Sequence, residues 1–407
     1  MNVTIVVGGG AAGLISAYFS AKNGDKVVLI EKNEKLGKKL YITGKGRCNV
    51  TNDCDEREFL ENVVTNPKFL TSAVYKFPPS EFYKFLNEKV PLKIERGNRV
   101  FPLSDKASDI TACLEKYCKQ AGVEIKLNEK VLKITATNGK ITGVTTDKSE
   151  YKANRVIVCT GGLSYPSTGS TGDGYKFAAD LGIAVVPPVA ALCGFNLKGE
   201  DFKPLQGISL KNVNFTAEFN GKVVYTAFGE ALFTHFGISG PIVISASSYL
   251  NRKDLKSVVF TLDLKPALTE EQLDARILRD FEKFKGRAVK NSLDDLLLKA
   301  FIPLALKAAG ISGEIKNSTL SREDRKKLVH TIKNLKFYPA SLRGVSEAIV
   351  TSGGVSVKEI NPSTMESKKI KGLYFAGEVL DIDALTGGFN ITAAACTAFV
   401  AGSSTEE

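Results

Sequence analysis

Short apolar runs alternate with amphipathic stretches along the first part of the chain. Residues 3–7 and 27–30 are runs of apolar and mostly β-branched residues, and the stretch 14–22 between them is compatible with a helix. Apolar runs of this length beside glycine are typical of buried strands. The pattern therefore predicts a strand, a helix and a second strand in that order.

The turn between the first strand and the helix contains Gly8, Gly10 and Gly13 in the spacing GxGxxG. In such a unit the first glycine permits a tight turn, the second lets a pyrophosphate approach the backbone, and the third lets helix and strand pack closely. The helix amino terminus offers free N–H groups to the phosphates. Glu31 ends the second strand, where it is placed to bind an adenosine ribose. These features predict a dinucleotide site.

Later segments extend this pattern. Helices are predicted at 56–62, 79–88 and 104–120, and short strands at 123–127, 131–136, 141–145 and 155–160. The stretch 191–264 is strand-like, 269–333 is helical, strand and glycine signals return from 353, and 391–400 is an apolar helix. Because nucleotide-binding signals stand near both ends, we predict one nucleotide domain interrupted by an insertion of roughly 191–349, β first and then α.

Composition narrows the class of protein. The chain has 407 residues, of which 43% are hydrophobic and 24% charged, as in globular proteins. Seven cysteines occur without a CxxC pair, and there are two histidines, which disfavours a disulfide framework and a zinc site. The apolar start has no preceding basic residues, so we expect no signal peptide. No later stretch has eighteen uninterrupted apolar residues, so we expect no membrane partner, and the cysteine pattern fits a reducing cytoplasm. The net charge of +11 is interpreted as a generally basic surface.

Four further segments are rich in glycine where strands are predicted to end. They are 36–52, 159–174, 229–241 and 372–391. In open α/β sheets ligands bind at the carboxyl ends of the strands. The last segment reads Gly-Leu-Tyr-Phe-Ala-Gly-Glu and is followed by Gly387 and Gly388, which open a helix. Its carboxylate would meet a ribityl chain and its helix dipole a flavin, so the prediction is FAD rather than NAD.

Together these segments resemble the NAD(P)/FAD-dependent oxidoreductases known as BaiN-type or YhiN-type flavoproteins, a family that includes enzymes described as aminoacetone oxidases. The motifs GGGAAG, EKN, GKGRCNVTN, RVFP, SYPSTGSTGDG, LFTHFGISGP, TSGGV and LYFAGEVLD with TGGFN follow one another from residue 8 to residue 390. Two positions depart from the family: Ile391-Thr392 replaces the usual Leu-Gln, and Ile183 stands where histidine is frequent. Both departures bear on the substrate pocket.

The resemblance implies a fold and a set of cofactor contacts. The fold is α/β: a Rossmann-like FAD-binding domain, 1–190 and 350–407, interrupted by an insertion in which a β-barrel, 191–265 and 325–349, carries a helical subdomain, 266–324. FAD is expected to be bound without a covalent link, with NAD(P)H as a transient reductant. The predicted cofactor-binding residues are Gly8, Gly10, Ala11, Ala12, Gly13, Glu31, Lys32, Lys39, Thr43, Gly44, Gly46, Arg47, Cys48, Asn49, Thr51, Val131, Thr160, Gly161, Gly162, Thr171, Gly172, Asp173, Gly377, Glu378, Asp381, Gly387, Gly388, Phe389, Asn390 and Ile391.

The resemblance suggests two reactions and the sequence leaves both open. One is NAD(P)H-linked reduction of a conjugated double bond in an enone or a steroid-like or bile-acid-like substrate. The other is oxidation of a small amine by dioxygen with release of hydrogen peroxide. No second glycine motif has strand and helix flanks, so a nicotinamide would visit the flavin transiently. Tyr165 and His235 are the candidate proton-transfer groups, and Arg47 is a candidate to steady an oxyanion.

The sequence leaves two further classes of function open. An RNA-modifying flavoprotein agrees with the sequence pI of about 9.1. However, the sequence shows no evident basic helix or aromatic-interleaved stripe, so nucleic acid is disfavoured as a partner. A flavin-binding protein without catalysis is the other class. Cys48 and Cys54 are interpreted as packed residues and not as a redox pair. We expect a small-molecule substrate and a monomer or small homo-oligomer.

Overall fold

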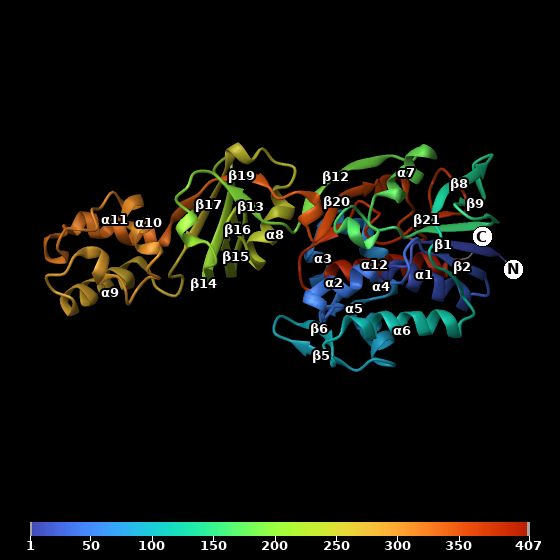
Figure 1. Cartoon of the computed structure of the whole chain (residues 1–407), viewed down its shortest axis with the longest axis horizontal. Helices are drawn as coiled ribbons and strands as arrows, with labels where there is room; N and C mark the ends of the chain where they lie inside the picture. Colours follow the sequence, from blue (N-terminus) through green and yellow to red (C-terminus); the bar gives the residue numbers. More distant parts are fainter. Residues whose placement is uncertain (1, 405–407) are drawn as a thin grey trace. The chain divides into compact units, whose positions relative to one another are not determined.

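A computed structural model describes residues 2–404 (Figure 1). The chain divides into two compact units. The first comprises the residues up to Ala191 and those from Gly344 onward, and the second comprises Leu192–Arg343.

The first unit is built on a five-stranded parallel sheet with the order β21-β11-β1-β2-β7. The strands are β1 (Val3–Val7), β2 (Lys26–Ile30), β7 (Glu124–Lys126), β11 (Arg155–Val158) and β21 (Leu373–Phe375). The central strands β1, β2 and β11 are almost wholly buried, which explains why they appear in the sequence as continuous apolar runs. β21 comes from the far end of the chain and completes the sheet.

Two helices lie together in this unit. They are α1 (Ala11–Lys22) and α12 (Phe389–Ser403), and both are largely buried. Ser16 Oγ donates to Ala398 O at 3.2 Å, and a Cβ on Gly402 would lie 2.6 Å from Ser16 O. Small residues at this contact therefore let the first and last helices approach closely.

A buried ion pair fixes the rim of the sheet. Arg155 is 1% exposed; its Nη1 lies 2.6 Å from Asp25 Oδ2, and its Nη2 donates to Ala401 O at 2.8 Å. Thr4 Oγ1 also donates to Asp25, at 2.7 Å. These bonds join β1, β11 and the end of α12.

The remaining helices of the first unit are α2 (Lys38–Ile42), α3 (Glu56–Glu61), α4 (Pro67–Lys76), α5 (Pro79–Asn87), α6 (Ala107–Gln120) and α7 (Asp173–Asp180). Small sheets add β3 (Thr51–Asn52), β4 (Val63–Thr65), β5 (Leu92–Glu95), β6 (Arg99–Pro102), β8 (Val131–Thr137), β9 (Lys140–Thr146), β10 (Glu150–Lys152), β12 (Val185–Ala191), β20 (Val350–Val355) and β22 (Asp383–Ala384). The helix predicted from residue 104 begins only at Ala107, because Asp105 has a φ of 58°, which is not helical.

The second unit contains a seven-stranded antiparallel sheet with the order β18-β17-β14-β15-β16-β13-β19. Its strands are β13 (Phe195–Leu197), β14 (Ser209–Phe219), β15 (Lys222–Thr234), β16 (Gly237–Ser239), β17 (Val258–Asp263), β18 (Leu335–Phe337) and β19 (Pro339–Leu342). The two edge strands, β18 and β19, are consecutive and separated by Tyr338 alone. Phe195, Phe215, Phe233 and Phe260 are fully buried in its core.

Four helices accompany this sheet: α8 (Pro241–Leu250), α9 (Glu270–Lys283), α10 (Phe301–Ala309) and α11 (Arg322–Lys333). The last three pack together, α11 against both others (Figure 1). The predicted return to β structure at residue 325 is wrong, because α11 continues to Lys333. Ser321 caps this helix by accepting from Asp324 N at 3.0 Å, and Leu328, Val329 and Ile332 form its buried face. Between residues 2 and 404 no helix is long and apolar enough to cross a membrane.

Candidate cofactor and active site

The amino terminus of α1 presents unpaired backbone N–H groups. The first hydrogen bond of the helix runs from Leu14 N to Gly10 O, and no side chain caps this end. A Cβ on Gly10 would meet nothing within 4 Å, whereas one on Gly13 would lie 1.8 Å from Gly8 O. Gly13 is therefore required by packing, and Gly10 faces open space beside a helix terminus that suits an anion.

Glu31 is held at the end of β2 beside this terminus. Its Oε2 accepts from Gly9 N at 2.6 Å, and its Oε1 accepts from Asn33 N at 2.8 Å. The side chain is buried. These two donors fix the carboxylate where the sequence predicts an adenosine ribose.

Lys32, which follows Glu31, contacts the segment after β11. Lys32 Nζ lies 2.6 Å from Asp173 Oδ2 and 2.6 Å from Thr171 Oγ1. Thr160 opens the same segment, and its buried Oγ1 has no hydrogen-bond partner within the described residues. A buried hydroxyl of this kind is normally satisfied by a ligand or water. Lys32, Thr171, Asp173 and Thr160 were all predicted to contact the cofactor.

The loop 43–52 lies against the amino terminus of α12. Thr51 Oγ1 is 2.8 Å from Thr392 Oγ1, and Asn52 Nδ2 donates to Gly387 O at 3.0 Å. A Cβ on Gly388 would lie 2.3 Å from Thr51 O, so only glycine fits there. No side chain caps α12, which makes this a second helix terminus open to an acceptor group.

Two predicted residues, Lys39 and Glu378, belong to one polar network. Lys39 Nζ lies 2.6 Å from Glu378 Oε2 and donates to Ser164 Oγ at 2.6 Å. Glu378 Oε1 accepts from Thr351 N at 3.0 Å and from Ser164 Oγ at 3.1 Å. Sequence reasoning missed Ser164 and Thr351 as site residues, although both stand in motifs that it quoted. The network joins α2 and β20 to the segments that follow β11 and β21.

Other predicted contacts have structural partners. Asn390 pairs with the backbone of Ala384, donating at 2.7 Å and accepting at 3.0 Å, and so holds the loop before α12. Asp381 Oδ2 accepts from Asn66 Nδ2 at 3.0 Å. Val131 is buried at the start of β8. Their contacts with a cofactor remain predictions.

The three catalytic candidates lie in different surroundings. Tyr165 is half-buried and has φ 53° and ψ 61°, a left-handed conformation that is rare for a bulky residue. Strain of this kind is concentrated at functional sites. His235 is exposed in the turn between β15 and β16 and belongs to the second unit. Arg47 forms ion pairs with Glu95 and Asp105, with Nε 2.7 Å from Asp105 Oδ1.

These ion pairs occupy the Arg47 nitrogens that an oxyanion role would need. A hydrogen bond from the Arg47 guanidinium lowers the pKa of the Glu95 carboxyl, and hydrogen bonds from Lys93 and Arg47 lower the pKa of the Asp105 carboxyl. Both carboxylates therefore remain charged beside Arg47 and satisfy its donors. Its guanidinium also lies over the Phe101 ring, 4.3 Å from the centroid, which indicates a role in holding the loop 43–52 against β6.

The cysteines are free thiols, and most are buried. Burial raises the pKa of Cys48 to about 11 and that of Cys54 to about 12. A thiol with a raised pKa is a poor nucleophile at neutral pH. The interpretation of Cys48 as a packed residue of the loop agrees with these surroundings.

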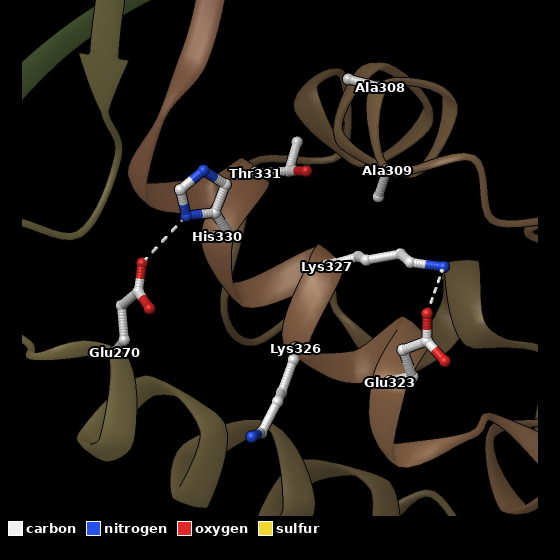
Figure 2. A pocket seen from close by; sticks show the side chains of 8 residues that line it. All are labelled: Glu270, Ala308, Ala309, Glu323, Lys326, Lys327, His330 and Thr331. Carbon is white, nitrogen blue, oxygen red and sulfur yellow. Dashed lines mark hydrogen bonds and ion pairs between the residues drawn. The ribbon is translucent and has the colours of Figure 1, made fainter.

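A hollow elsewhere contains none of the predicted site residues. It lies between α10, α11 and the start of α9, and Glu270, Ala309, Lys326 and His330 are among its lining residues (Figure 2). Its charged groups are partly paired with one another, as His330 Nδ1 is with Glu270 Oε1 at 3.2 Å.

The described residues fit FAD. Two uncapped helix termini, the open space at Gly10, the fixed Glu31 carboxylate and the unpartnered Thr160 hydroxyl belong to segments that end at the carboxyl edge of one parallel sheet. A dinucleotide needs one such terminus for its pyrophosphate, and the second suits the pyrimidine edge of a flavin.

A family model described as "HI0933-like protein Rossmann domain" matches residues 2–404. The chain belongs to this family. Two curated relatives are named ribosomal RNA dihydrouridine synthase: that of Escherichia coli K12 is 32% identical over 95% of this chain and 93% of its own length, and that of Haemophilus influenzae is 33% identical over 95% and 94%. A 3-dehydro-bile acid delta(4,6)-reductase of Clostridium scindens is 29% identical over the full length of both chains.

Solved structures agree on the fold. A flavocytochrome c3 fumarate reductase aligns with a TM-score of 0.52 at 17% identity, covering 99% of this chain and 77% of that one. A 3-ketosteroid-Δ4-(5α)-dehydrogenase of Rhodococcus jostii aligns with a TM-score of 0.52 at 14% identity, covering 99% and 95%. The protein is an oxidoreductase of the FAD-dependent, Rossmann-like class, as the sequence predicts.

Proposed function

We propose that this protein reduces a carbon–carbon double bond conjugated with a carbonyl group. The observation that carries the proposal is the chemistry shared by the relatives that span nearly the whole chain. A dihydrouridine is a uridine with its C5=C6 bond saturated, and that bond is conjugated with the C4 carbonyl. A 3-dehydro Δ4,6 bile acid has its double bonds conjugated with a 3-oxo group. Reduction of the uridine C5=C6 bond and reduction of the bile acid Δ4 bond each add a hydride β to the carbonyl and a proton α to it.

We further propose the uracil base of an RNA as the substrate class, in place of the small molecule favoured by sequence alone. Two relatives above 30% identity have names that refer to ribosomal RNA. The net charge of +11 favours a polyanionic substrate over a neutral one. A free steroid-like enone is the second candidate, because the bile acid reductase matches this chain from end to end.

The residues of the first unit would divide the work between binding and proton transfer. When bound, FAD supplies hydride transfer at its N5 position. The α1 terminus at Gly10 would bind the pyrophosphate, and Glu31 the adenosine ribose. Tyr165 Oη would donate the proton to the α carbon; in support, Tyr165 stands in the segment that follows β11 and has a left-handed backbone of the kind that concentrates at functional sites. The electron pair comes from NAD(P)H, which leaves as NAD(P)+.

Anaerobic reduction tests this proposal. The purified FAD protein is mixed with NADH or NADPH and flavin absorbance is followed, after which a cyclic enone or a uridine-containing RNA hairpin is added. We expect slow bleaching by a nicotinamide, recovery of the yellow colour with the acceptor, and two added hydrogens in the product by mass spectrometry. Rapid bleaching by aminoacetone, with hydrogen peroxide formed in air and no response to either nicotinamide, would overturn the proposal in favour of an amine oxidase.

Tyr165→Phe tests the assigned proton donor. The variant keeps the ring and loses the hydroxyl, so we expect turnover to fall roughly 100-fold or more while the FAD dissociation constant stays within about twofold. His235→Ala is the matched comparison at the other candidate. Equal losses of turnover and FAD binding in Tyr165→Phe would mean that this tyrosine is scaffold.

A further inference from the structure

A basic segment begins at the last residue of α9, in the second unit, and continues into the loop that follows. Residues 283–290 read Lys-Phe-Lys-Gly-Arg-Ala-Val-Lys, four cations with no acid among eight residues. The expectation that the chain lacks a basic stripe interleaved with an aromatic residue is wrong here. Composition over longer windows hides the segment, because acids precede and follow it.

Hydrogen bonds fix the backbone of the basic segment. Val289 N donates to Ile315 O at 2.9 Å, and Asn317 N donates to Arg287 O at 2.8 Å. The buried Asn317 side chain donates to Phe284 O at 2.8 Å and accepts from Gly286 N at 3.0 Å. The cations are therefore carried on an ordered loop, which lowers the entropy lost when a ligand binds.

The side chains combine charge with an aromatic face. The Phe284 ring lies 4.9 Å from Lys283 Nζ and 5.0 Å from Arg287 Cζ, both measured to its centroid. Lys316 comes from the strand-like partner of the segment, through the bridge Ala288↔Lys316. Arg287 and Lys316 are exposed, and neither has a carboxylate partner within residues 2–404.

The other three cations have exposed partners. Lys283 pairs with Asp295 at 2.6 Å, Lys290 with Glu314 at 2.5 Å, and Lys285 with Glu282 at 3.2 Å. Exposed pairs of this kind are weak, so a phosphate group can compete for the lysines. With Lys316 the surface has five cations against these three acids.

The distribution of charge between the two units also favours the second unit as the site of RNA binding. Residues 192–343 contain 24 Lys and Arg against 16 Asp and Glu, whereas the rest of the chain contains 31 against 28. The positive excess thus belongs mainly to the second unit, although that unit is the smaller of the two. A uniformly solvated basic surface would spread this excess over both units.

We propose that the basic segment, together with Lys316, binds the phosphate backbone of an RNA substrate; this rests on the proposed function. Arg287 offers a planar fork suited to phosphate, and Lys316 adds a second contact from across its bridge with Ala288. Phosphate contacts position an RNA without reading its bases. The segment therefore supplies affinity and orientation, while choice of the base belongs to the active site.

Binding by the holoenzyme of a fluorescent, uridine-containing RNA hairpin tests the proposal. Arg287→Ala with Lys316→Ala removes the two cations that have no acid partner. Lys198→Ala with Lys211→Ala is the control, because both lysines are exposed in the same unit and the charge change is equal. We expect the first pair to raise the dissociation constant roughly 5- to 30-fold near 0.1 M salt and to reduce the salt slope by about 1 to 2. The control should change affinity less than twofold.

Reduction of a small cyclic enone, measured on the same proteins, separates this proposal from the proposed function. Unchanged enone turnover with weakened RNA binding supports the basic segment. If no enone or RNA is reduced by any variant but RNA binding still depends on Arg287 and Lys316, the proposed function fails and the surface stands. Three results would overturn the proposal for the basic segment. The control pair could weaken RNA binding as much as the first pair, or neither pair could weaken it. The third is that binding of anionic lipid vesicles depends on Arg287 and Lys316 while RNA binding does not.

Discussion

At the scale of single residues, the glycines of the first turn separate folding from binding. A side chain at Gly10 meets nothing in the protein, whereas one at Gly13 collides with Gly8 O. We therefore expect Gly10→Val to fold, at a cost of about 1 kcal/mol for a poorer helix cap, and to lose FAD affinity at least 100-fold. Thermal unfolding of the FAD-free protein and titration with FAD measure the two effects.

Gly13→Ala is the comparison for this prediction. Its Cβ would lie 1.8 Å from Gly8 O, so the variant should lose stability whether or not FAD is present. A Gly10→Val protein that binds FAD with normal affinity would show that the pyrophosphate does not sit at this turn.

The buried thiols should make the protein less stable at alkaline pH. Burial raises the pKa of Cys48 to about 11 and those of Cys118 and Cys159 to about 12. An unfolded thiol has a pKa of about 8.5, so the unfolded state loses these protons first. The stability that these thiols contribute is fully present below about pH 8.5 and is lost as the pH rises toward their folded pKa values. Each such thiol should lower the free energy of unfolding by about 1.4 kcal/mol per pH unit within that window.

Urea unfolding at about pH 8.0 and 9.5 checks this sign, because unfolded tyrosines are still largely protonated there. Cys118→Ala should show a smaller loss between the two values than the parent protein. A free energy of unfolding that rises with pH in this range would contradict the assignment of these thiols as buried and neutral.

At the scale of elements, the sequence predicts the strands and turns that are determined by residues close together in the chain. The glycine turn at Gly8 and the apolar runs of β1, β2 and β11 are set by neighbouring residues, so pattern alone finds them. The local pattern also predicts helix up to residue 333, in agreement with α11, whereas the bound of 324 that the family resemblance gave for the helical subdomain is too short. The pairing of Lys39 with Glu378 escapes pattern reasoning altogether, because 339 positions separate the two residues.

The buried side chain of Asn317 fixes the loop after α9 in the second unit. Its buried amide donates to Phe281 O and Phe284 O at the end of α9 and to Ser292 Oγ. Asn317→Ala would leave buried carbonyls unsatisfied, and we expect a loss of about 1 to 3 kcal/mol in the free energy of unfolding. Hydrogen exchange should show faster opening at 281–290, with flavin absorbance unchanged.

Ser318→Ala is the control, since Ser318 is the exposed neighbour of Asn317. It should leave both stability and hydrogen exchange close to those of the parent. If Asn317→Ala behaves like Ser318→Ala, the loop after α9 does not depend on this amide.

At the scale of the whole molecule, the candidate FAD site needs both ends of the chain. β1 and β11 come from the first half of the sequence, and β21 and α12 come from the last 35 residues. Within the first unit, β12 pairs with β20, so Ala191 lies opposite Val350 across two antiparallel strands. The chain thus leaves this unit and returns to it at neighbouring positions.

This topology predicts which pieces of the protein hold FAD. A fragment ending at residue 190 lacks Glu378, Gly388 and α12, and α1 loses the helix packed against it, so we expect it not to bind FAD. A variant in which a short glycine–serine linker replaces residues 192–343 keeps both ends, and we expect it to bind FAD within about tenfold of the full chain's affinity. Flavin fluorescence quenching on titration measures both. Binding by the short fragment as tight as that of the full chain would show that residues 377–391 are not part of the site. A linked variant that folds by circular dichroism yet holds no flavin would assign part of the site to the insertion.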